Sequence, residues 1–315
     1  MELGYWLSSE EHAPRDLVAN ARAAEEAGFS YAVISDHFHP WIDAQGQSPF
    51  VWSVLGGIAQ ATERLTIGTG VTCPLMRIHP AIVAHAAATT AAMLPGRFFL
   101  GVGTGENLNE HVTGAKWPAP DERLEMLEEA VDVIRKLWEG GYRTHRGRRY
   151  TVEQARLYTL PDEPPPIVVA AAQEQAAELA GQIGDGYMNV APDADTLKTY
   201  EQAGGSGPKH GKVTGCFAGS KDQAKRIAHE RWPNNALGGS LSQDLALPRD
   251  FEAAVKAVRP DDVAESLVLG NDPDEWVAQI REFDRAGFTH VALHDLNPDQ
   301  APFIAFARDE VAPRL

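Results

Sequence analysis

The chain has 315 residues, of which 43% are hydrophobic, and it carries a formal net charge of −16 at pH 7. This length and apolar content suffice to bury a large core, so we expect a globular protein with one large domain or two smaller ones. Nucleic acids and anionic membranes bind basic faces. The negative charge and the lack of a long Lys/Arg run therefore argue against both as the main partner.

Cysteine usage and the N-terminus indicate the compartment. The two cysteines, Cys73 and Cys216, are far apart and outside any CxxC pattern, which suggests a reducing environment without a disulfide framework. The first residues lack the basic and apolar regions of a signal peptide, and no window reaches the roughly 18 apolar residues of a membrane span. We expect a cytoplasmic, enzyme-sized protein.

Short apolar runs alternate with amphipathic segments, which is typical of parallel strands joined by helices. Strands are expected at 3–7, 31–34, 65–70, 97–103, 167–171, 186–190, 212–217 and within 284–295. The clearest helices are expected at 14–27, 80–94, 121–139, 173–183 and 221–232. Eight parallel strands in a chain of this size favour a closed (β/α)8 TIM barrel over an open doubly wound sheet.

Two distant segments support a ring of recurring units. EEAGFSYAVISDH (25–37) and DRAGFTHVALHD (284–295) share a helix end, a Gly, a Phe, an apolar strand and then polar residues. Such a repeat is expected when one βα unit recurs around a barrel. We predict a single barrel domain over 1–315, with a hairpin insertion near 141–160 and a lid-like insertion near 233–267.

The carboxyl ends of barrel strands meet at one mouth, so residues after different strands converge there. The sequence SDHFHPW (35–41) follows the second expected strand. Polar stretches also follow strands one, three, four and eight, at 8–12, 69–77, 103–110 and 294–295.

The residues at these ends favour acid/base chemistry. No GxSxG or SxxK motif, Cys/His signature or P-loop is present, and GVGTGE (101–106) lacks the GxGxxG turn into a helix of dinucleotide sites. An imidazole and a carboxylate suit the oxidation of an alcohol: a base takes the hydroxyl proton while hydride leaves to a flat ring cofactor. Glycines 68, 70, 101, 103 and 105 would let the backbone approach such a ring.

Several blocks carry a family resemblance from end to end: SSEEHAPRDL, SDHFHPW, IGTGVTCPLMRIHPAIVA, LPGRFFLGVGTGENLNE, LAGQIGDG and APRL. The chain resembles the luciferase-like superfamily of (β/α)8 flavin and deazaflavin enzymes. Within that superfamily it is similar to the coenzyme F420-dependent glucose-6-phosphate dehydrogenases and secondary alcohol dehydrogenases. The resemblance implies an F420-dependent oxidoreductase that moves a hydride between a CH–OH group and C5 of the deazaflavin, commonly as a homodimer.

The resemblance also implies roles for residues at the mouth. His37 would deprotonate the substrate hydroxyl and Trp41 would pack beside the reacting centre. Glu106 would be the proton partner of the cofactor ring, and Glu10 a second carboxylate beside the substrate. A non-prolyl cis peptide, Gly70–Val71, would lie behind the ring. Further cofactor contacts would come from Asp36, Cys73, Thr104, Gly105, Asn109, Ala172, Gln173, Gln175 and Ala176. Ala172 and Gln173 stand where the family has a Gly-Gly pair that cradles the cofactor phosphate, and the helix N-terminal amides from Gln173 to Ala176 would bind that anion instead.

Other positions concern the substrate. Sugar-phosphate members bind the phosphate with a Thr and a Lys after strand six, where this chain has Val190 and Asp193. A carboxylate there repels a phosphate, so we expect an unphosphorylated alcohol or sugar. Trp232, at the start of the lid-like insertion, is placed to reach the substrate.

Four alternatives stay open. The chain could be an F420-dependent glucose-6-phosphate dehydrogenase, an FMN-dependent luciferase-like monooxygenase, or a cofactor-binding protein without activity. A metal-dependent TIM-barrel hydrolase could use His37 and His39 with His294 and Asp295, although Pro40 and Trp41 interrupt the pattern and we expect no metal.

Overall fold

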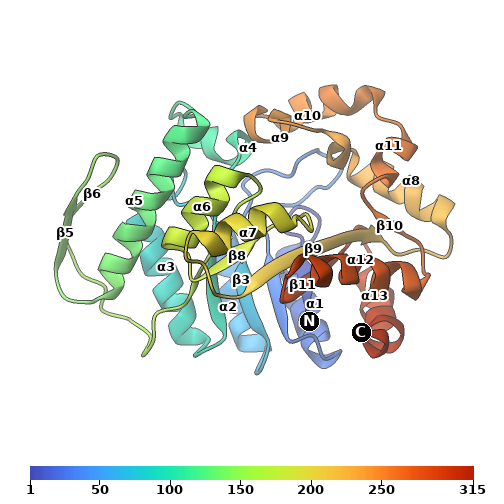
Figure 1. Cartoon of the computed structure of the whole chain (residues 1–315), viewed down its shortest axis with the longest axis horizontal. Coiled ribbons are helices and arrows are strands. Elements are labelled where there is room, and N and C mark those ends of the chain that lie inside the picture. Colours follow the sequence, from blue (N-terminus) through green and yellow to red (C-terminus); the bar gives the residue numbers. More distant parts are fainter.

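The computed structural model describes all 315 residues as a closed parallel barrel surrounded by helices (Figure 1). Seven strand pairings run around the sheet in the order β9, β11, β1, β2, β3, β4, β7 and β8, and β8 pairs with β9 to close the ring. All these pairings are parallel. The barrel strands are β1 (Glu2–Leu7), β2 (Tyr31–Ile34), β3 (Thr66–Thr69), β4 (Phe98–Val102), β7 (Ile167–Ala170), β8 (Gly186–Met188), β9 (Lys209–Cys216) and β11 (His290–Asp295).

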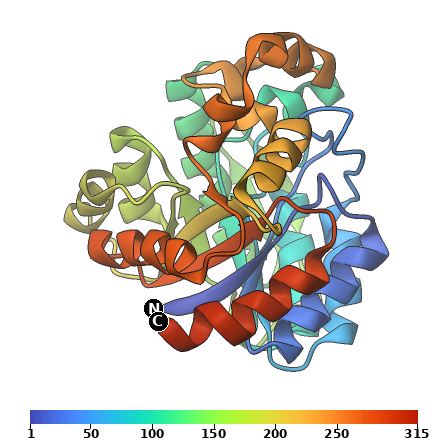
Figure 2. The ribbon, with the colours of Figure 1, turned by 90° about the vertical axis from the view of Figure 1, so that its right-hand side faces the viewer.

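Helices cover the outside of the barrel, and both termini lie at the same end of the molecule (Figure 2). The longer helices are α1 (Pro14–Glu26), α2 (Val51–Ala61), α3 (Pro80–Met93), α5 (Pro120–Trp138), α6 (Glu174–Ile183), α7 (Ala194–Gln202), α8 (Lys221–Arg231), α12 (Pro273–Ala286) and α13 (Gln300–Phe306). No helix combines the length and the apolar character needed to cross a membrane.

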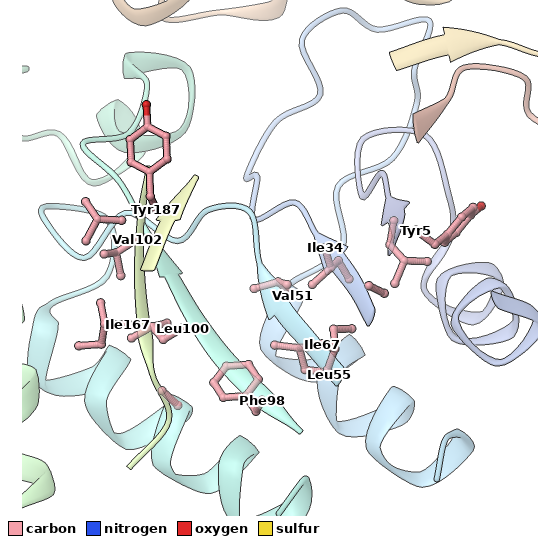
Figure 3. Packing of buried hydrophobic residues seen from close by; sticks show 14 of the residues in the cluster. Tyr5, Ile34, Val51, Leu55, Ile67, Phe98, Leu100, Val102, Ile167 and Tyr187 are labelled. Atoms are coloured by element: carbon pink, nitrogen blue, oxygen red, sulfur yellow. The ribbon is translucent and has the colours of Figure 1, made fainter. Parts of the chain in front are cut away.

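Side chains alternate between the two faces of each strand, which gives the barrel two cores. In β2, Ala32 and Ile34 belong to a cluster of 58 buried residues between strands and helices. Figure 3 shows Val51 and Leu55 of α2 packed beside Ile67 in this outer core. The neighbouring residues of β2 face the interior instead, in an inner cluster of Trp6, Tyr31, Val33, Phe99, Val168, Met188 and Ala292.

Among the longer helices, α2, α7 and α13 are absent from the sequence-based prediction, and α12 is expected only through its end in the repeat at 284–295. Helix α2 begins after Phe50 without a side-chain cap and contains Gly56 and Gly57, so it lacks a start signal and includes poor helix formers. Its buried face against the strands stabilises it. Helix α7 does have a start signal, because Asp193 caps it, but that residue was interpreted only for its charge.

Two strands have bounds that differ by two or more residues from those expected from the sequence. Strand β9 begins at Lys209, three residues earlier than expected, because His210 faces the barrel interior, against Tyr31 and Phe99, although it looks like a loop residue. Strand β8 ends at Met188 rather than at residue 190. A short strand, β10 (Val268–Leu269), pairs in parallel with the end of β9 and was not expected.

Two insertions interrupt the alternation. An antiparallel hairpin, β5 (Arg143–Arg146) and β6 (Thr151–Ala155), projects beside α5 at the left of Figure 1. Between α8 and β10, the short helices α9 (Leu241–Asp244), α10 (Pro248–Ala254) and α11 (Pro260–Ala264) lie at the top of Figure 1, beyond the carboxyl ends of the strands.

Candidate active site

The centre of the candidate site is a histidine beside a carboxylate. Nε2 of His37 lies 3.3 Å from Oε1 of Glu10, and both side chains are at least nine-tenths buried. His37 follows β2 and Glu10 follows β1, so two neighbouring strand ends bring them together. This places an imidazole and an anion side by side at the barrel mouth.

Two hydroxyl groups fix the Glu10 carboxylate. Ser35 donates a hydrogen bond of 2.6 Å and Ser8 one of 3.0 Å to Oε2, which leaves Oε1 toward His37. Burial alone would raise the pKa of Glu10, but the charge of His37, the Ser35 hydroxyl and Lys212 outweigh it and lower the pKa. Glu10 is therefore a carboxylate near neutral pH.

Asn109 of the short helix α4 (Asn107–Glu110) connects the loop that carries His37 to Glu106. Its Nδ2 lies 3.2 Å from Nδ1 of His37 and donates to Oε2 of Glu106 at 3.2 Å. Its Oδ1 accepts hydrogen bonds from the backbone amides of Phe38 and His39, at 2.9 and 3.3 Å. Asn109 thus orders the loops that carry both predicted acid/base residues.

Trp41 lies between the histidine and the insertion. Its ring centroid is 5.0 Å from that of His37 and 5.3 Å from that of Phe251 in α10. Asn107 of α4 also donates to the carbonyl of Asp244 in α9 at 2.9 Å. The 233–267 segment therefore contacts the loops after β2 and β4 directly.

Two glycines near the ends of β3 and β4 allow close packing at the mouth. A Cβ on Gly70 would lie 2.3 Å from Val33 and 2.8 Å from Trp6, so only glycine fits there. The Gly70–Val71 peptide bond is cis, as the resemblance implies. Gly105 has φ of +72°, and a Cβ there would meet Sγ of Cys73 at 2.6 Å. Both glycines therefore let neighbouring side chains pack directly against the backbone on this side of the mouth.

Asp36 lies below the site rather than on its surface. Its side chain is fully buried, and its two oxygens accept hydrogen bonds from Thr72, at 2.7 Å, and Arg77, at 2.8 Å. Arg77 also pairs with Glu110 at 3.5 Å. This network holds the end of β2 against the loop after β3.

The N-terminus of α6 is exposed. Ala172, Gln173 and Gln175 are exposed, Ala176 is half-buried, and Gln173 caps the helix without a side-chain hydrogen bond. The first amides of this helix are thus free to bind an anion, which the helix dipole favours. Thr104, at the end of β4, is also half-buried.

The predicted substrate residues lie in different surroundings. Val190 is exposed and Asp193 caps α7, accepting from the amides of Asp195 at 2.9 Å and Thr196 at 3.2 Å. Trp232 is buried, with its ring centroid 5.2 Å from that of His294. The capping explains why an Asp stands at 193.

Some residues near the site escaped the sequence reasoning. Ser35 is part of SDHFHPW, but only the structure shows its bond to Glu10. Glu11 and Lys212 were not singled out either: Glu11 adjoins Glu10, and Lys212 stands in a strand whose polar residues resemble a loop. The alternation of side chains along β9 could have identified Lys212, because it assigns this residue to the inward face of the strand.

His39 and Asp295, offered for the metal alternative, have other partners. Nδ1 of His39 lies 2.9 Å from the carbonyl oxygen of Leu108, and Asp295 accepts from the amide of Phe217 at 2.7 Å. No group of three or more His, Cys, Asp or Glu side chains is arranged to hold a metal ion. The geometry gives that alternative no support.

Known proteins are similar to the whole chain. A family model described as luciferase-like monooxygenase matches residues 1–290. The F420-dependent glucose-6-phosphate dehydrogenase of Beutenbergia cavernae is 36% identical, covering 100% of this chain and 97% of its own. The protein of the same description from Mycobacterium avium is 35% identical, covering 100% and 98%.

A solved structure agrees. An F420-dependent secondary alcohol dehydrogenase in complex with an F420-acetone adduct is 32% identical, with a TM-score of 0.91 over 98% of this chain and 97% of that chain. The barrel, its strand-end residues and these end-to-end similarities lead to one conclusion: the chain belongs to the luciferase-like family.

Proposed function

We propose that the protein is a coenzyme F420-dependent dehydrogenase that transfers a hydride between the CH–OH group of a secondary alcohol or sugar and C5 of the deazaflavin. The observation that carries this proposal is the buried His37–Glu10 pair at the barrel mouth. It occurs in a chain whose relatives at 32 to 36% identity are named as F420-dependent dehydrogenases.

The residues at the mouth fit a deazaflavin. Because Gly70 packs closely on Trp6 and Gly105 on Cys73, neither position sends a side chain into the mouth, and we assign the backbone of Val71 to the flat ring. The exposed start of α6, at Gln173–Ala176, offers free amides to the phosphate of the cofactor tail. When bound, the deazaflavin supplies the ring that accepts or returns the hydride.

His37 is the base in this proposal. Its Nδ1 lies 3.2 Å from the carbonyl oxygen of His39, and we assign the ring N–H to Nδ1, where it donates to that carbonyl and leaves the lone pair on Nε2. The proton of the substrate hydroxyl would move to Nε2 while the carbon that bears this hydroxyl gives up its hydride, leaving a carbonyl group. Glu10 then stabilises the imidazolium across 3.3 Å. Such a base contributes about 10² to 10⁴ in rate.

Glu106 and Trp41 complete the proposed site. Glu106 is half-buried and held by Asn109, which supports a role as proton partner of the cofactor ring. Trp41 stacks near His37 and limits the access of water from the side of α10. Asp36, Cys73 and Thr104 are assigned to the surroundings of the cofactor.

The proposed substrate is neutral. Asp193 adds a negative charge and Val190 offers no hydrogen bond where sugar-phosphate enzymes bind the phosphate, and the chain carries a charge of −16. A phosphate dianion needs several charge-assisted hydrogen bonds. We propose that the protein acts in the cytoplasm as a homodimer, a state that light scattering of the purified protein tests.

One experiment tests the function. Purified protein is titrated with F420 and, separately, with FMN, and cofactor reduction is then followed with secondary alcohols, free sugars and sugar phosphates. Tight binding of F420 and its reduction by a neutral alcohol or sugar is the expected result. Binding of FMN with oxygen-dependent turnover would favour the monooxygenase alternative instead.

A further inference from the structure

Lys212 places a charge inside the barrel. Strand β9 pairs Lys212 with Ala292, an inner-core residue, while the next residue, Val213, belongs to the outer core. The Lys212 side chain therefore faces the interior. Its Nζ lies 4.4 Å from the centroid of the Trp6 ring, which itself touches the space around Gly70. The ammonium group is thus at the floor of the mouth.

This ammonium group contacts the face of the Trp6 ring but has no hydrogen-bond acceptor within the chain. Lys212 is half-buried, donates no hydrogen bond and forms no salt bridge, although the carboxyl groups of Glu10 and Glu11 are close enough to affect its charge. Burial lowers the pKa of Lys212 to about 8, against the opposing effect of the two carboxyl groups, so it is mostly charged at pH 7. The Trp6 ring offers no hydrogen-bond acceptor, so a bound oxygen atom would stabilise the partly desolvated ammonium group.

Other polar atoms beside it are also unpaired. Oε2 of Glu11 and both ring nitrogens of His294 are buried without a hydrogen bond, and Oε2 lies 3.6 Å from Nε2 of His294. The indole N–H of Trp232 faces Glu11 but forms no hydrogen bond of good geometry. Oε1 of Glu11 accepts from Arg231 at 3.4 Å. Donors and acceptors are therefore mixed on this side of the mouth.

The acidic groups and the single ammonium group together determine which kind of ligand can bind beside Lys212. Glu10 is a carboxylate, and Glu11 is partly ionised because burial raises its pKa to about 7. An anionic group beside Lys212 would meet these acidic groups, so the single cation does not favour it. A hydroxyl both donates and accepts, and can bind an ammonium and a carboxylate together. Neutral hydroxyl groups satisfy this set best.

We propose that Lys212 is a specificity-determining residue that binds a second hydroxyl of the substrate, next to the carbon that His37 oxidises. The substrate class is then a neutral polyol or sugar rather than a plain secondary alcohol. This inference rests on the proposed F420-dependent function. It adds the requirement for a neighbouring hydroxyl, which the relatives' names do not state.

The test compares two substrates that differ in one hydroxyl, 2,3-butanediol and 2-butanol, with F420 as acceptor. The wild-type protein is expected to have the higher kcat/KM for the diol. Lys212→Met, which removes the ammonium and keeps the chain length, is expected to reduce the diol-to-butanol ratio of kcat/KM about 10- to 100-fold. Lys212→Gln keeps a donor and is expected to retain part of the ratio.

The controls separate a contact from a folding defect. Lys209→Met alters the other end of β9, where Lys209 pairs with Glu201 at the surface, and should leave the ratio unchanged. Thermal unfolding and F420 titration show whether each variant is folded and loaded. Equal losses for both substrates in Lys212→Met and Lys212→Gln, or no diol preference in the wild type, would overturn the inference alone. Absence of F420 reduction by every alcohol and sugar would overturn the proposed function as well.

Discussion

Oε1 of Glu10 lies 3.3 Å from Nε2 of His37, and the two residues come from neighbouring strands, β1 and β2. The carboxylate is held on its other side by Ser8 and Ser35. The imidazole therefore has an anion beside the nitrogen that would take a proton. Several measurable consequences follow from this pair and from the residues that support it.

Asn109 is expected to matter for both stability and turnover. Asn109→Ala removes an acceptor of two backbone amides and the link between the loop that carries His37 and Glu106. We expect a loss of about 1–3 kcal/mol in the free energy of unfolding and a larger fall in kcat than in F420 affinity. Urea unfolding and steady-state kinetics measure both effects. Asn107→Ala, which removes a bond to the insertion, is the matched control, and an equal fall in kcat there would contradict the assignment.

Stability should depend on the ionisation of Glu11. Burial raises its pKa from 4.5 to about 7, so the folded state binds a proton more tightly than the unfolded state, and stability falls as pH rises between these values. Glu11→Gln removes this penalty. Relative to the wild type, the variant should gain about 2 kcal/mol more at pH 8 than at pH 5.

Urea unfolding at the two pH values measures this gain. Glu26→Gln, on the surface of α1, is the control and should show little change with pH. A pH-independent difference for Glu11→Gln would show that loss of the Arg231 contact dominates instead.

Glucose-6-phosphate is expected to reduce F420 poorly or not at all. Asp193→Asn retains an N-cap for α7 and removes the negative charge, so it should raise kcat/KM for the phosphorylated sugar relative to a neutral one, while stability changes little. Kinetics with glucose and glucose-6-phosphate measure this ratio. Efficient reduction with the phosphate in the unchanged protein would refute the substrate assignment.

The strand pattern was largely readable from the sequence because apolar runs separated by amphipathic helices specify the alternation. The expected strands all occur in the barrel, and the fold is confirmed by the closed sheet and the solved relative. Helices α2 and α7 were missed because tertiary packing, rather than propensity, stabilises α2, and because the cap of α7 was considered only as a charge.

The part of the site that lies within one sequence motif was predictable. The part that depends on side chains from distant strands meeting in space was not. SDHFHPW identifies His37, but the spacing of residues along the chain does not show that Ser35 binds Glu10, or that Lys212 rises beside Trp6 from a strand far along the sequence. Those contacts depend on the register between strands and on which face of β9 points inward. The alternation in the sequence indicates that face only if polar residues are allowed inside the barrel.

The central claim is that His37 is the base facing a deazaflavin in the barrel mouth, and His37→Ala tests it most directly. The measurement pairs F420 titration with the rate of F420 reduction by the best neutral alcohol, using His39→Ala as the control. The account predicts that kcat falls by about 10² to 10⁴ while F420 still binds with nearly unchanged affinity. Undiminished turnover in His37→Ala, or loss of F420 binding from a folded variant, would contradict it.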